Sequence, residues 1–352
     1  MKKIFITLIF VSLAIHASNL EAQQFYSPSN PHIQYMGRID FSNPEHPTFY
    51  AAGIQILFSF KGKSCVIDLT DENLYGKNLN YIQLIVDGKY SRFRLTGKEN
   101  KIPVDGLADS VHSVIICKTT ESNIGYLQFN GVTCRELIAS PALPTRKIEC
   151  FGNSITCGTG SDMEEIPCGK GVWQDQHNAY LSYGAQTARA LQAQYHLTSA
   201  SGIGLMHSCC DMKVTMPQIY DKINLRDNLI PWDFSNYQPD VVTICLGQND
   251  GIQDQWVFCE RYIQFIRSLR NVYPQAKIVL LTSPMGDEKL TKVLKTYLSL
   301  VTDELNLSGD TNVSTFFFSR SYNSGCDSHP SLAEHKLIAS ELTKYLKKLM
   351  HW

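Results

Sequence analysis

The sequence predicts two domains, an all-β sandwich followed by an α/β domain with a parallel sheet. Residues 34–138 hold short runs rich in β-branched and aromatic residues, separated by turn-forming pairs, which is typical of a β-sandwich. Residues 146–352 alternate apolar runs with amphipathic stretches, which indicates parallel strands covered by helices on both faces. The chain has 352 residues, more than one hydrophobic core usually supports.

The first domain is expected to consist of short strands joined by tight turns. Turn signals occur at Lys61-Gly62, Asp87-Gly88 and Asn130-Gly131. Two nearby prolines in residues 140–144 favour an extended linker, so we place the domains at residues 24–140 and 146–352. The expected strands are residues 55–60, 64–69, 81–86, 91–95, 110–117 and 125–129.

The second domain is expected to begin with a buried strand and to end with a helix. Ligands of open parallel sheets bind outside the carboxyl ends of the strands, so the chemistry is expected in residues 151–160, residues 247–251 and the loop around His329. The expected strands are residues 147–151, 241–246 and 277–282, and the expected helices are residues 182–195, 256–272, 289–305 and 331–348.

The N-terminus has the features of a secretory leader. Lys2 and Lys3 precede an apolar run over residues 4–15, and Ala22 supplies a small residue for cleavage. The run is shorter than the about 20 apolar residues that a membrane-spanning helix needs. We therefore predict a cleaved signal peptide at residues 1–22, export to the periplasm or the medium, and no membrane attachment afterwards.

Charge and cysteine content exclude some partners. The formal net charge is -1, so no global field draws the chain to nucleic acid or to an anionic membrane. The 11 cysteines lack the paired spacings of zinc sites, and we predict no metal. Cys117 and Cys245 lie in apolar runs and are expected to be buried free thiols. Cys157 and Cys168 flank a glycine-rich loop and are candidates for a local bridge.

Two residues in the α/β part have the chemistry of a nucleophile and its base. Ser154 follows the strand expected at residues 147–151, where a tight turn would lift a hydroxyl clear of the sheet. Its alternative role is a helix cap. His329 precedes the last expected helix, and a neutral imidazole is a suitable base for a serine hydroxyl. Its alternative is an ordinary loop histidine.

Other candidates would stabilise negative charge or hold a sugar. Asn249 follows the strand at residues 241–246 and has an amide N–H to donate, although Asn is also a common turn residue. Gly202 offers a backbone N–H where the chain must approach closely. Trp173 and Trp256 could stack on a sugar ring, but each is more often a packing residue.

Together these blocks resemble the SGNH (GDSL-like) hydrolase superfamily. The motifs are Gly-Asn-Ser at 152–154, Gly202, Gly-Gln-Asn-Asp at 247–250 and Asp-Ser-His-Pro at 327–330, in the family's order. The resemblance implies a three-layer, flavodoxin-like α/β domain without a cofactor. It also implies that Ser154 is the nucleophile, that His329 is the base, and that Ser154 N–H, Gly202 N–H and the Asn249 amide form the oxyanion hole.

The front half resembles carbohydrate esterase family 2. The residues that carry this resemblance are 35–41, 53–54, 84–88 and 112–121. Members of that family place a jelly-roll domain before an SGNH domain and deacetylate plant polysaccharides. The resemblance therefore implies an acetyl xylan esterase-like enzyme that removes acetyl groups from a polysaccharide or oligosaccharide of the xylan or glucomannan type.

The chain departs from the SGNH pattern at one position, and two alternative functions remain open. Many SGNH enzymes carry an acid three residues before the histidine, where this chain has Cys326, so either Asp327 or a backbone carbonyl would orient His329. Some family 2 esterases are described as using a Ser-His dyad. The alternatives are an inactive carbohydrate-binding protein, which the intact serine, histidine and asparagine disfavour, and an esterase acting on cell-wall glycan, a lipid or a thioester.

Overall fold

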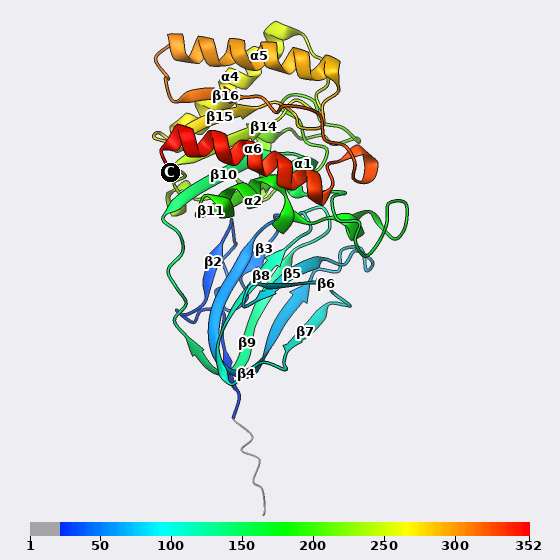
Figure 1. Cartoon of the computed structure of the whole chain (residues 1–352), viewed down its shortest axis with the longest axis vertical. Helices are drawn as coiled ribbons and strands as arrows, with labels where there is room; N and C mark the ends of the chain where they lie inside the picture. The colour runs from blue at the N-terminus through cyan, green and yellow to red at the C-terminus, as the bar shows by residue number, and fades with distance from the viewer. Residues whose placement is uncertain (1–21) are drawn as a thin grey trace, which may run out of the picture.

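The structure is a computed structural model that describes residues 22–352, so all of the predicted signal peptide except Ala22 lies outside the described residues. The molecule is elongated, with antiparallel strands in one half and an α/β half stacked on it (Figure 1). Within the described range, no helix is both long and apolar enough to cross a membrane.

The antiparallel half is organised around one long strand, β4 (Gln55–Asp71). It pairs with β8 (Ser110–Lys118) along its first part, with β7 (Glu99–Val104) along its second, and with β9 (Leu127–Ile138) along both. The remaining strands of this half are β1 (Gln24–Tyr26), β2 (Gln34–Met36), β3 (Thr48–Phe49), β5 (Tyr81–Val86) and β6 (Lys89–Arg94).

Two of the three predicted turns in this half are wrong. β4 runs through Lys61-Gly62, because neighbouring strands pair on both sides of it with only a shift of register between Lys61 and Cys65. Gly131 lies inside β9 at a second register shift, where a Cβ atom would stand 2.5 Å from the Tyr26 carbonyl oxygen. The turn at Asp87-Gly88 is confirmed, since it joins β5 to β6.

The α/β half contains a five-stranded parallel sheet in the order β11-β10-β14-β15-β16. In chain order this is 2-1-3-4-5, the order of flavodoxin-like folds, in which ligands bind at the switch point between the first and third strands. That point lies between β10 and β14. The strands are β10 (Arg146–Gly152), β11 (Ala193–Ser199), β14 (Val241–Cys245), β15 (Lys277–Leu281) and β16 (Val313–Phe316).

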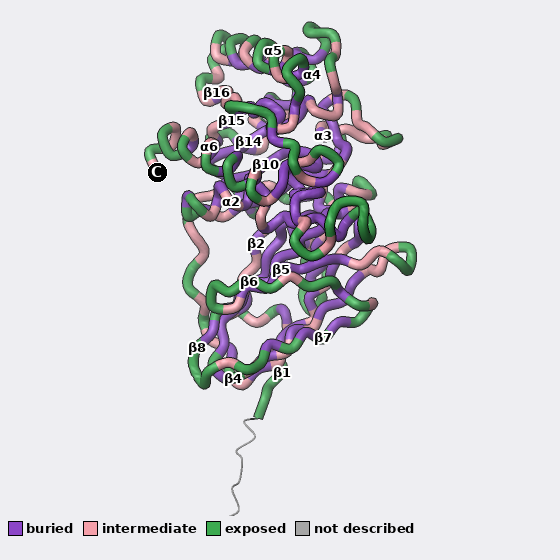
Figure 2. The backbone as a smooth tube through the Cα atoms, turned by 45° about the vertical axis from the view of Figure 1, so that its right-hand side comes forward, coloured by how far each residue is buried: buried purple, intermediate pink, exposed green. Residues whose placement is uncertain are grey.

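Helices cover both faces of this sheet, which gives three layers. In β14, Val242 and Ile244 pack into a core with residues of α4 (Gln255–Val272) and α5 (Glu288–Leu307). Val241 and Cys245 pack with residues of α2 (Tyr183–Ala190) and α6 (Leu332–Met350). Figure 2 shows that the strands of the sheet are largely buried. Shorter elements are α1 (Ser154–Cys157), α3 (Met216–Ile219), β12 (Lys222–Asn224) and β13 (Leu229–Pro231).

The helix predicted over residues 182–195 is wrong in its second part. α2 ends at Ala190, Gln192 has a left-handed φ of 52°, and the chain then enters β11. Tyr195 and Leu197 of β11 are buried against the neighbouring layer, so tertiary packing decides the local structure there. The short strand β16 was not predicted either.

Buried contacts join the two halves. Glu149 of β10 is fully buried and accepts hydrogen bonds from Arg38 of the front half at 2.6 Å, from Thr198 at 2.7 Å and from Tyr273. A second ion pair joins Arg226 to Glu72 at 2.9 Å. Removing one partner of a buried ion pair leaves an uncompensated charge, so the front half is part of the support for the sheet.

Candidate active site

Ser154 stands at the carboxyl end of β10, on the turn into α1. Asn153 is the N-cap, and its side-chain oxygen accepts the Ile155 N–H at 3.1 Å. A Cβ atom on Gly152 would lie 2.0 Å from Oγ1 of Thr156, so this turn requires glycine. Ser154 is 7% exposed. Because Asn153 supplies the cap, the Ser154 hydroxyl is free to form a hydrogen bond with another side chain.

That partner is His329, which lies 175 residues further along the chain. Its Nε2 is 2.8 Å from Oγ of Ser154, within reach for proton transfer. The imidazole follows a single helical turn (Cys326–Ser328) and precedes α6, which Ser331 caps. The structure thus brings together the two side chains singled out as nucleophile and base.

The second ring nitrogen of His329 faces a backbone carbonyl. Nδ1 lies 3.2 Å from the carbonyl oxygen of Cys326, which fits an N–H donated by Nδ1 and leaves Nε2 free to accept a proton. Asp327 has an exposed side chain, and within residues 22–352 no hydrogen bond joins its carboxylate to His329. Of the two orienting groups considered, the geometry therefore favours the carbonyl, and a role for Asp327 as hydrogen-bonded orienter is contradicted.

Asp327→Asn should accordingly change kcat for ester hydrolysis by less than about threefold, because an exposed charge is screened by solvent. The comparison is with His329→Ala, which removes the base itself. Steady-state kinetics with 4-nitrophenyl acetate provide the measurement. A fall of 100-fold or more in the asparagine variant, as is typical of a buried triad acid, would contradict this assignment.

Burial also controls the charge state of His329. Burial lowers the pKa of this imidazole, and the Cys326 carbonyl and the Asp327 charge partly oppose that effect. Two neighbouring histidines, His177 and His335, are fully buried, and burial lowers the pKa of each to about 3. Both are therefore neutral near pH 7.

Two of the three predicted oxyanion donors, Gly202 and Asn249, lie in loops at the same edge of the sheet as Ser154. The ends of β11 and β14 are level with Gly152 in the register of the sheet. Gly202 has a left-handed φ of 82° in the loop after β11. Asn249, after β14, donates from Nδ2 to the Ile203 carbonyl at 2.8 Å, which ties the two loops together.

Two carboxylates hold the Gly202 loop in place, and the sequence analysis assigned no role to either. Asp250 accepts the N–H groups of Leu205 at 2.9 Å, Met206 at 2.7 Å and His207 at 2.9 Å. Glu121, which follows β8 in the front half, is fully buried and accepts the N–H of Ser201 at 2.6 Å. A residue of the antiparallel half therefore anchors the amide next to Gly202.

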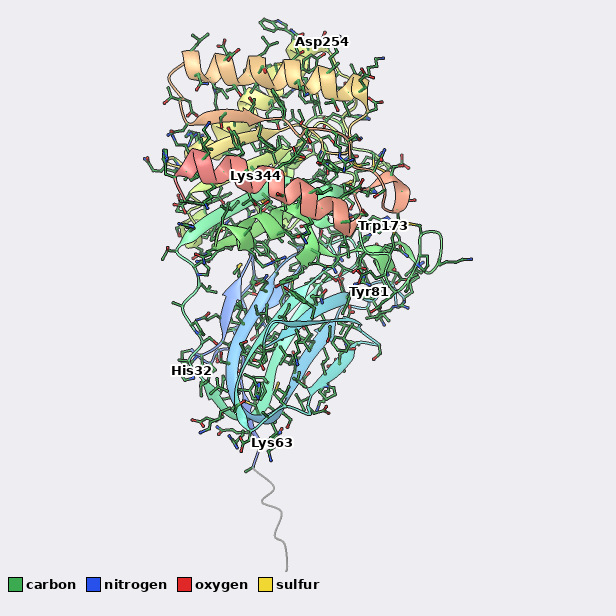
Figure 3. The ribbon with its side chains drawn as sticks, viewed as in Figure 1. His32, Lys63, Tyr81, Trp173, Asp254 and Lys344 are labelled. Carbon is green, nitrogen blue, oxygen red and sulfur yellow. A yellow bond between two sulfur atoms is a disulfide. The ribbon has the colours of Figure 1, made fainter. Side chains whose placement is uncertain are left out.

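The structure separates the two candidate tryptophans. Trp173 is 42% exposed, and its ring packs edge-on against His177, with 4.3 Å between the ring centroids. His177 in turn interacts electrostatically with His329. Trp256 is 84% exposed and lines a groove of about 700 Å³ formed by α4 and α5 residues, which includes neither Ser154 nor His329. Figure 3 shows Asp254, the N-cap of α4, far from Trp173. The groove that Trp256 lines is therefore separate from the Ser154–His329 pair, and a role for Trp256 in holding a sugar there is not supported.

The predicted Cys157–Cys168 bridge is also wrong. Cys168 is bonded to Cys326, and Cys209 is bonded to its neighbour Cys210. The Cys157 thiol is buried, where it donates to Ser199 and Glu121. The loop after α1 instead folds against the turn before His329, which places Cys168 beside Cys326. Cys117 and Cys245 are confirmed as buried free thiols.

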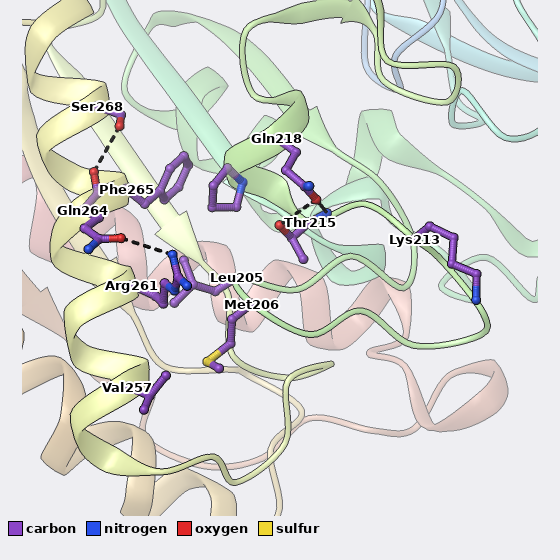
Figure 4. Close-up of a pocket in the computed structure, with 11 residues that line it drawn as sticks. Leu205, Met206, Lys213, Thr215, Gln218, Val257, Arg261, Gln264, Phe265 and Ser268 are labelled. Atoms are coloured by element: carbon purple, nitrogen blue, oxygen red, sulfur yellow. Dashed lines mark hydrogen bonds between the residues drawn. The ribbon is translucent and has the colours of Figure 1, made fainter.

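A hollow of about 580 Å³ lies next to the Gly202 loop (Figure 4). Leu205, Met206 and Lys213 line one side, and Arg261 and Phe265 of α4 line the other. Asp250 binds the backbone of this same loop, so the hollow adjoins the oxyanion region without containing the Ser154–His329 pair. Within residues 22–352, no group of three or more His, Cys, Asp or Glu side chains could hold a metal ion.

Two family models match the chain. Residues 35–141 match the model described as carbohydrate esterase 2 N-terminal, and residues 150–308 match the GDSL-like lipase/acylhydrolase family. The second match includes Ser154, Gly202 and Asn249 and ends before His329.

Characterised relatives resemble the chain over nearly its whole length. An acetylxylan esterase/glucomannan deacetylase of Cellvibrio japonicus is 30% identical over 339 residues, covering 92% of this chain and 90% of that protein. The cellulase/esterase CelE of Acetivibrio thermocellus is 33% identical over 344 residues, or 94% of this chain. The chain spans only 41% of the length of CelE.

Solved structures share the arrangement of both halves. A family two carbohydrate esterase from Clostridium thermocellum, in complex with cellohexaose, has a TM-score of 0.84 and 32% identity, with 91% of this chain and 99% of that chain covered. A family two carbohydrate esterase from Cellvibrio japonicus has a TM-score of 0.85 and 27% identity, with 94% and 99% covered.

Proposed function

Because the chain belongs to family 2 of the carbohydrate esterases, we propose that it removes acetyl groups from a polysaccharide of the xylan or glucomannan type, with Ser154 as nucleophile. The observation that carries this proposal is the 2.8 Å contact between the Ser154 hydroxyl and Nε2 of His329, at the switch point of the sheet. A serine hydroxyl becomes an effective nucleophile only when a base in such a position accepts its proton.

The reaction proceeds by acyl transfer in two steps. Ser154 Oγ attacks the ester carbonyl while Nε2 of His329 takes its proton, and the tetrahedral oxyanion is stabilised by the N–H groups of Ser154 and Gly202 and by the Asn249 amide. His329 then returns the proton to the departing sugar oxygen. Water, deprotonated by the same imidazole, releases acetate from Ser154 in the second step.

The dyad is oriented without a carboxylate. The Cys326 carbonyl accepts the Nδ1–H of His329 and fixes the tautomer in which Nε2 has a free lone pair. A neutral carbonyl stabilises the imidazolium less than a buried carboxylate would, and burial lowers the pKa of His329 further. The base is therefore weak, because its pKa lies below that of a free imidazole.

This charge state predicts the pH dependence. A protonated imidazole cannot accept the serine proton, so activity is lost as the pH falls through the pKa of His329 in the folded protein. Because that pKa is lowered from its ordinary value of about 6.5, the midpoint of the acid limb of kcat/KM should lie below pH 6.5, with a single ionisation. A half-maximal rate at pH 7 or above would contradict the lowered pKa.

The substrate class rests on the relatives. Two relatives are named acetylxylan esterase/glucomannan deacetylase, and one related structure is a complex with cellohexaose. Trp173, which is partly exposed and packs edge-on against His177, is the aromatic side chain that we assign to stacking on a sugar ring. Export is part of the same proposal, because a polysaccharide has to be met outside the cell.

Acetate release tests this function. Purified protein should release acetate from acetylated xylan or acetylated glucomannan at least ten times faster than from acetylated peptidoglycan, and Ser154→Ala should release none. Binding of polysaccharide without acetate release would instead indicate a carbohydrate-binding protein. A preference for peptidoglycan would place the substrate in the bacterial cell wall.

A further inference from the structure

We propose that the Cys168–Cys326 disulfide is a positioning device for His329: it holds the carbonyl that orients the imidazole and makes ester hydrolysis depend on the oxidised state of the chain. The inference rests on the proposed function, because it takes His329 to be the base. Cys326 occupies the position at which an acid would be expected, and its contribution to His329 comes from its backbone oxygen, 3.2 Å from Nδ1. Its side chain is bonded to Cys168.

The bridge joins the two segments that carry the dyad. The segment that follows Ser154 and α1 leads to Cys168, and the turn that begins with Cys326 leads to His329. Backbone hydrogen bonds run between the same segments, from Cys326 N–H to the Gly160 carbonyl at 2.8 Å and from Leu332 N–H to the Ser161 carbonyl at 2.9 Å. The disulfide is the covalent member of this set of contacts.

The turn that aims the Cys326 carbonyl needs such restraint. Asp327 and Ser328, which separate Cys326 from His329, have φ angles of 52° and 59°. Two consecutive non-glycine residues in the left-handed region are unfavourable for an isolated chain and persist where surrounding structure holds them. Opening the bridge removes one of these restraints, and the carbonyl can then rotate away from Nδ1.

Within residues 22–352, no side chain other than Ser154 is hydrogen-bonded to the His329 ring. The groups that act on this imidazole electrostatically are Asp327, His177 and His335. His177 and His335 are neutral at working pH, because burial lowers the pKa of each to about 3. The Asp327 side chain is exposed, and Asp327 raises the pKa of His329 through its charge and its backbone. Loss of the Cys326 carbonyl therefore removes the Nδ1 hydrogen bond that fixes the tautomer of His329.

The chain allows a selective test by reduction. The seven free cysteines of the described residues are all buried, so a dithiol acts on the two disulfides, converting each into two thiols while the dithiol is itself oxidised. The second disulfide, Cys209–Cys210, also lies near the site, since Cys209 N–H donates to the Gly202 carbonyl at 2.8 Å. A Cys209→Ser/Cys210→Ser variant therefore isolates the effect of Cys168–Cys326.

The experiment measures hydrolysis of 4-nitrophenyl acetate by three forms of the full chain. These are the oxidised protein, the protein reduced with dithiothreitol and the Cys168→Ser variant. Reduction and Cys168→Ser should each lower kcat by about 10- to 100-fold, the range expected when a catalytic group moves by about 1 Å, with KM unchanged within about twofold. The acid limb of the kcat profile should shift to lower pH, because a hydrogen bond that raises the pKa of His329 is lost. Cys209→Ser/Cys210→Ser should keep the same oxidised-to-reduced ratio.

Circular dichroism and thermal melting establish that each form is folded at the assay temperature. A folded, reduced protein with kcat within twofold of the oxidised protein and an unshifted acid limb would overturn the proposal. Should Cys168→Ser fail to fold, reduction of the folded Cys209→Ser/Cys210→Ser protein decides by the same criterion. An oxidised wild-type protein that hydrolyses no ester would instead refute the proposed function.

Discussion

Ser154→Ala should lower kcat for 4-nitrophenyl acetate by about 10⁴-fold or more, because the attacking atom is removed and the donors alone give only residual catalysis. The fold should be retained. Asn153, and not Ser154, caps α1, and the Ser154 hydroxyl has His329 as its partner. Steady-state kinetics and a thermal melt measure the two effects on the same preparation.

Ser161→Ala is the matched control for that variant. Ser161 is also buried and follows α1, but its hydroxyl donates to the Gly158 carbonyl at 2.8 Å and takes no part in the dyad. Its replacement should leave kcat within about tenfold of the wild-type value while costing about 1 kcal/mol of stability. Turnover by a folded Ser154→Ala protein at a rate near that of wild type would refute the assignment of the nucleophile.

Asn249→Ala should give the second large loss, about 10² to 10³-fold in kcat, as is typical when one oxyanion donor is removed. One N–H of the Asn249 amide is donated to the Ile203 carbonyl, and the amide has a second N–H for the oxyanion. KM should change little, because the charge on the oxyanion develops in the transition state and not in the bound ester.

The neighbouring amide, Gln248, provides the control for Asn249. Its Oε1 accepts a hydrogen bond from the Ser283 hydroxyl at 2.5 Å, so this side chain binds the loop after β15. Gln248→Ala should lower kcat by less than about tenfold. Equal losses in the two variants would indicate that Asn249 acts through the shape of the loop and not as a donor, and the melting temperatures would show whether the loop has loosened.

The fold was predictable where a local pattern decides the structure. The continuous apolar run of β14 and the amphipathic repeat of α4 define their elements without reference to the rest of the chain. β11 was missed because the residues before it follow a helical pattern and the strand is specified by its pairing with β10. The turn predicted at Lys61-Gly62 failed for the same reason, since the strands beside β4 continue through it.

The nucleophile and the base of the candidate site could be predicted from the sequence, but the residues that hold their loops in place could not. Ser154 and His329 stand in short motifs that can be seen in one sequence, whereas the contact of Glu121 with Ser201 joins two domains across a sequence separation of 80 residues. The pairing of Cys168 with Cys326, across 158 residues, depends on how the loop after α1 folds back. Neither contact can be seen as a local pattern in the sequence, because tertiary structure brings the partners together. For the disulfide, tertiary structure also decides which of the eleven cysteines pair.

Mass spectrometry of the covalent intermediate tests the acyl-transfer mechanism most directly. Protein quenched in acid during turnover of an aryl acetate should carry one acetyl group, and peptide mapping should place it on Ser154. His329→Ala, measured in parallel, should acquire this group far more slowly. An acetyl group found reproducibly on another residue that is required for turnover, with Ser154 unmodified, would contradict the mechanism.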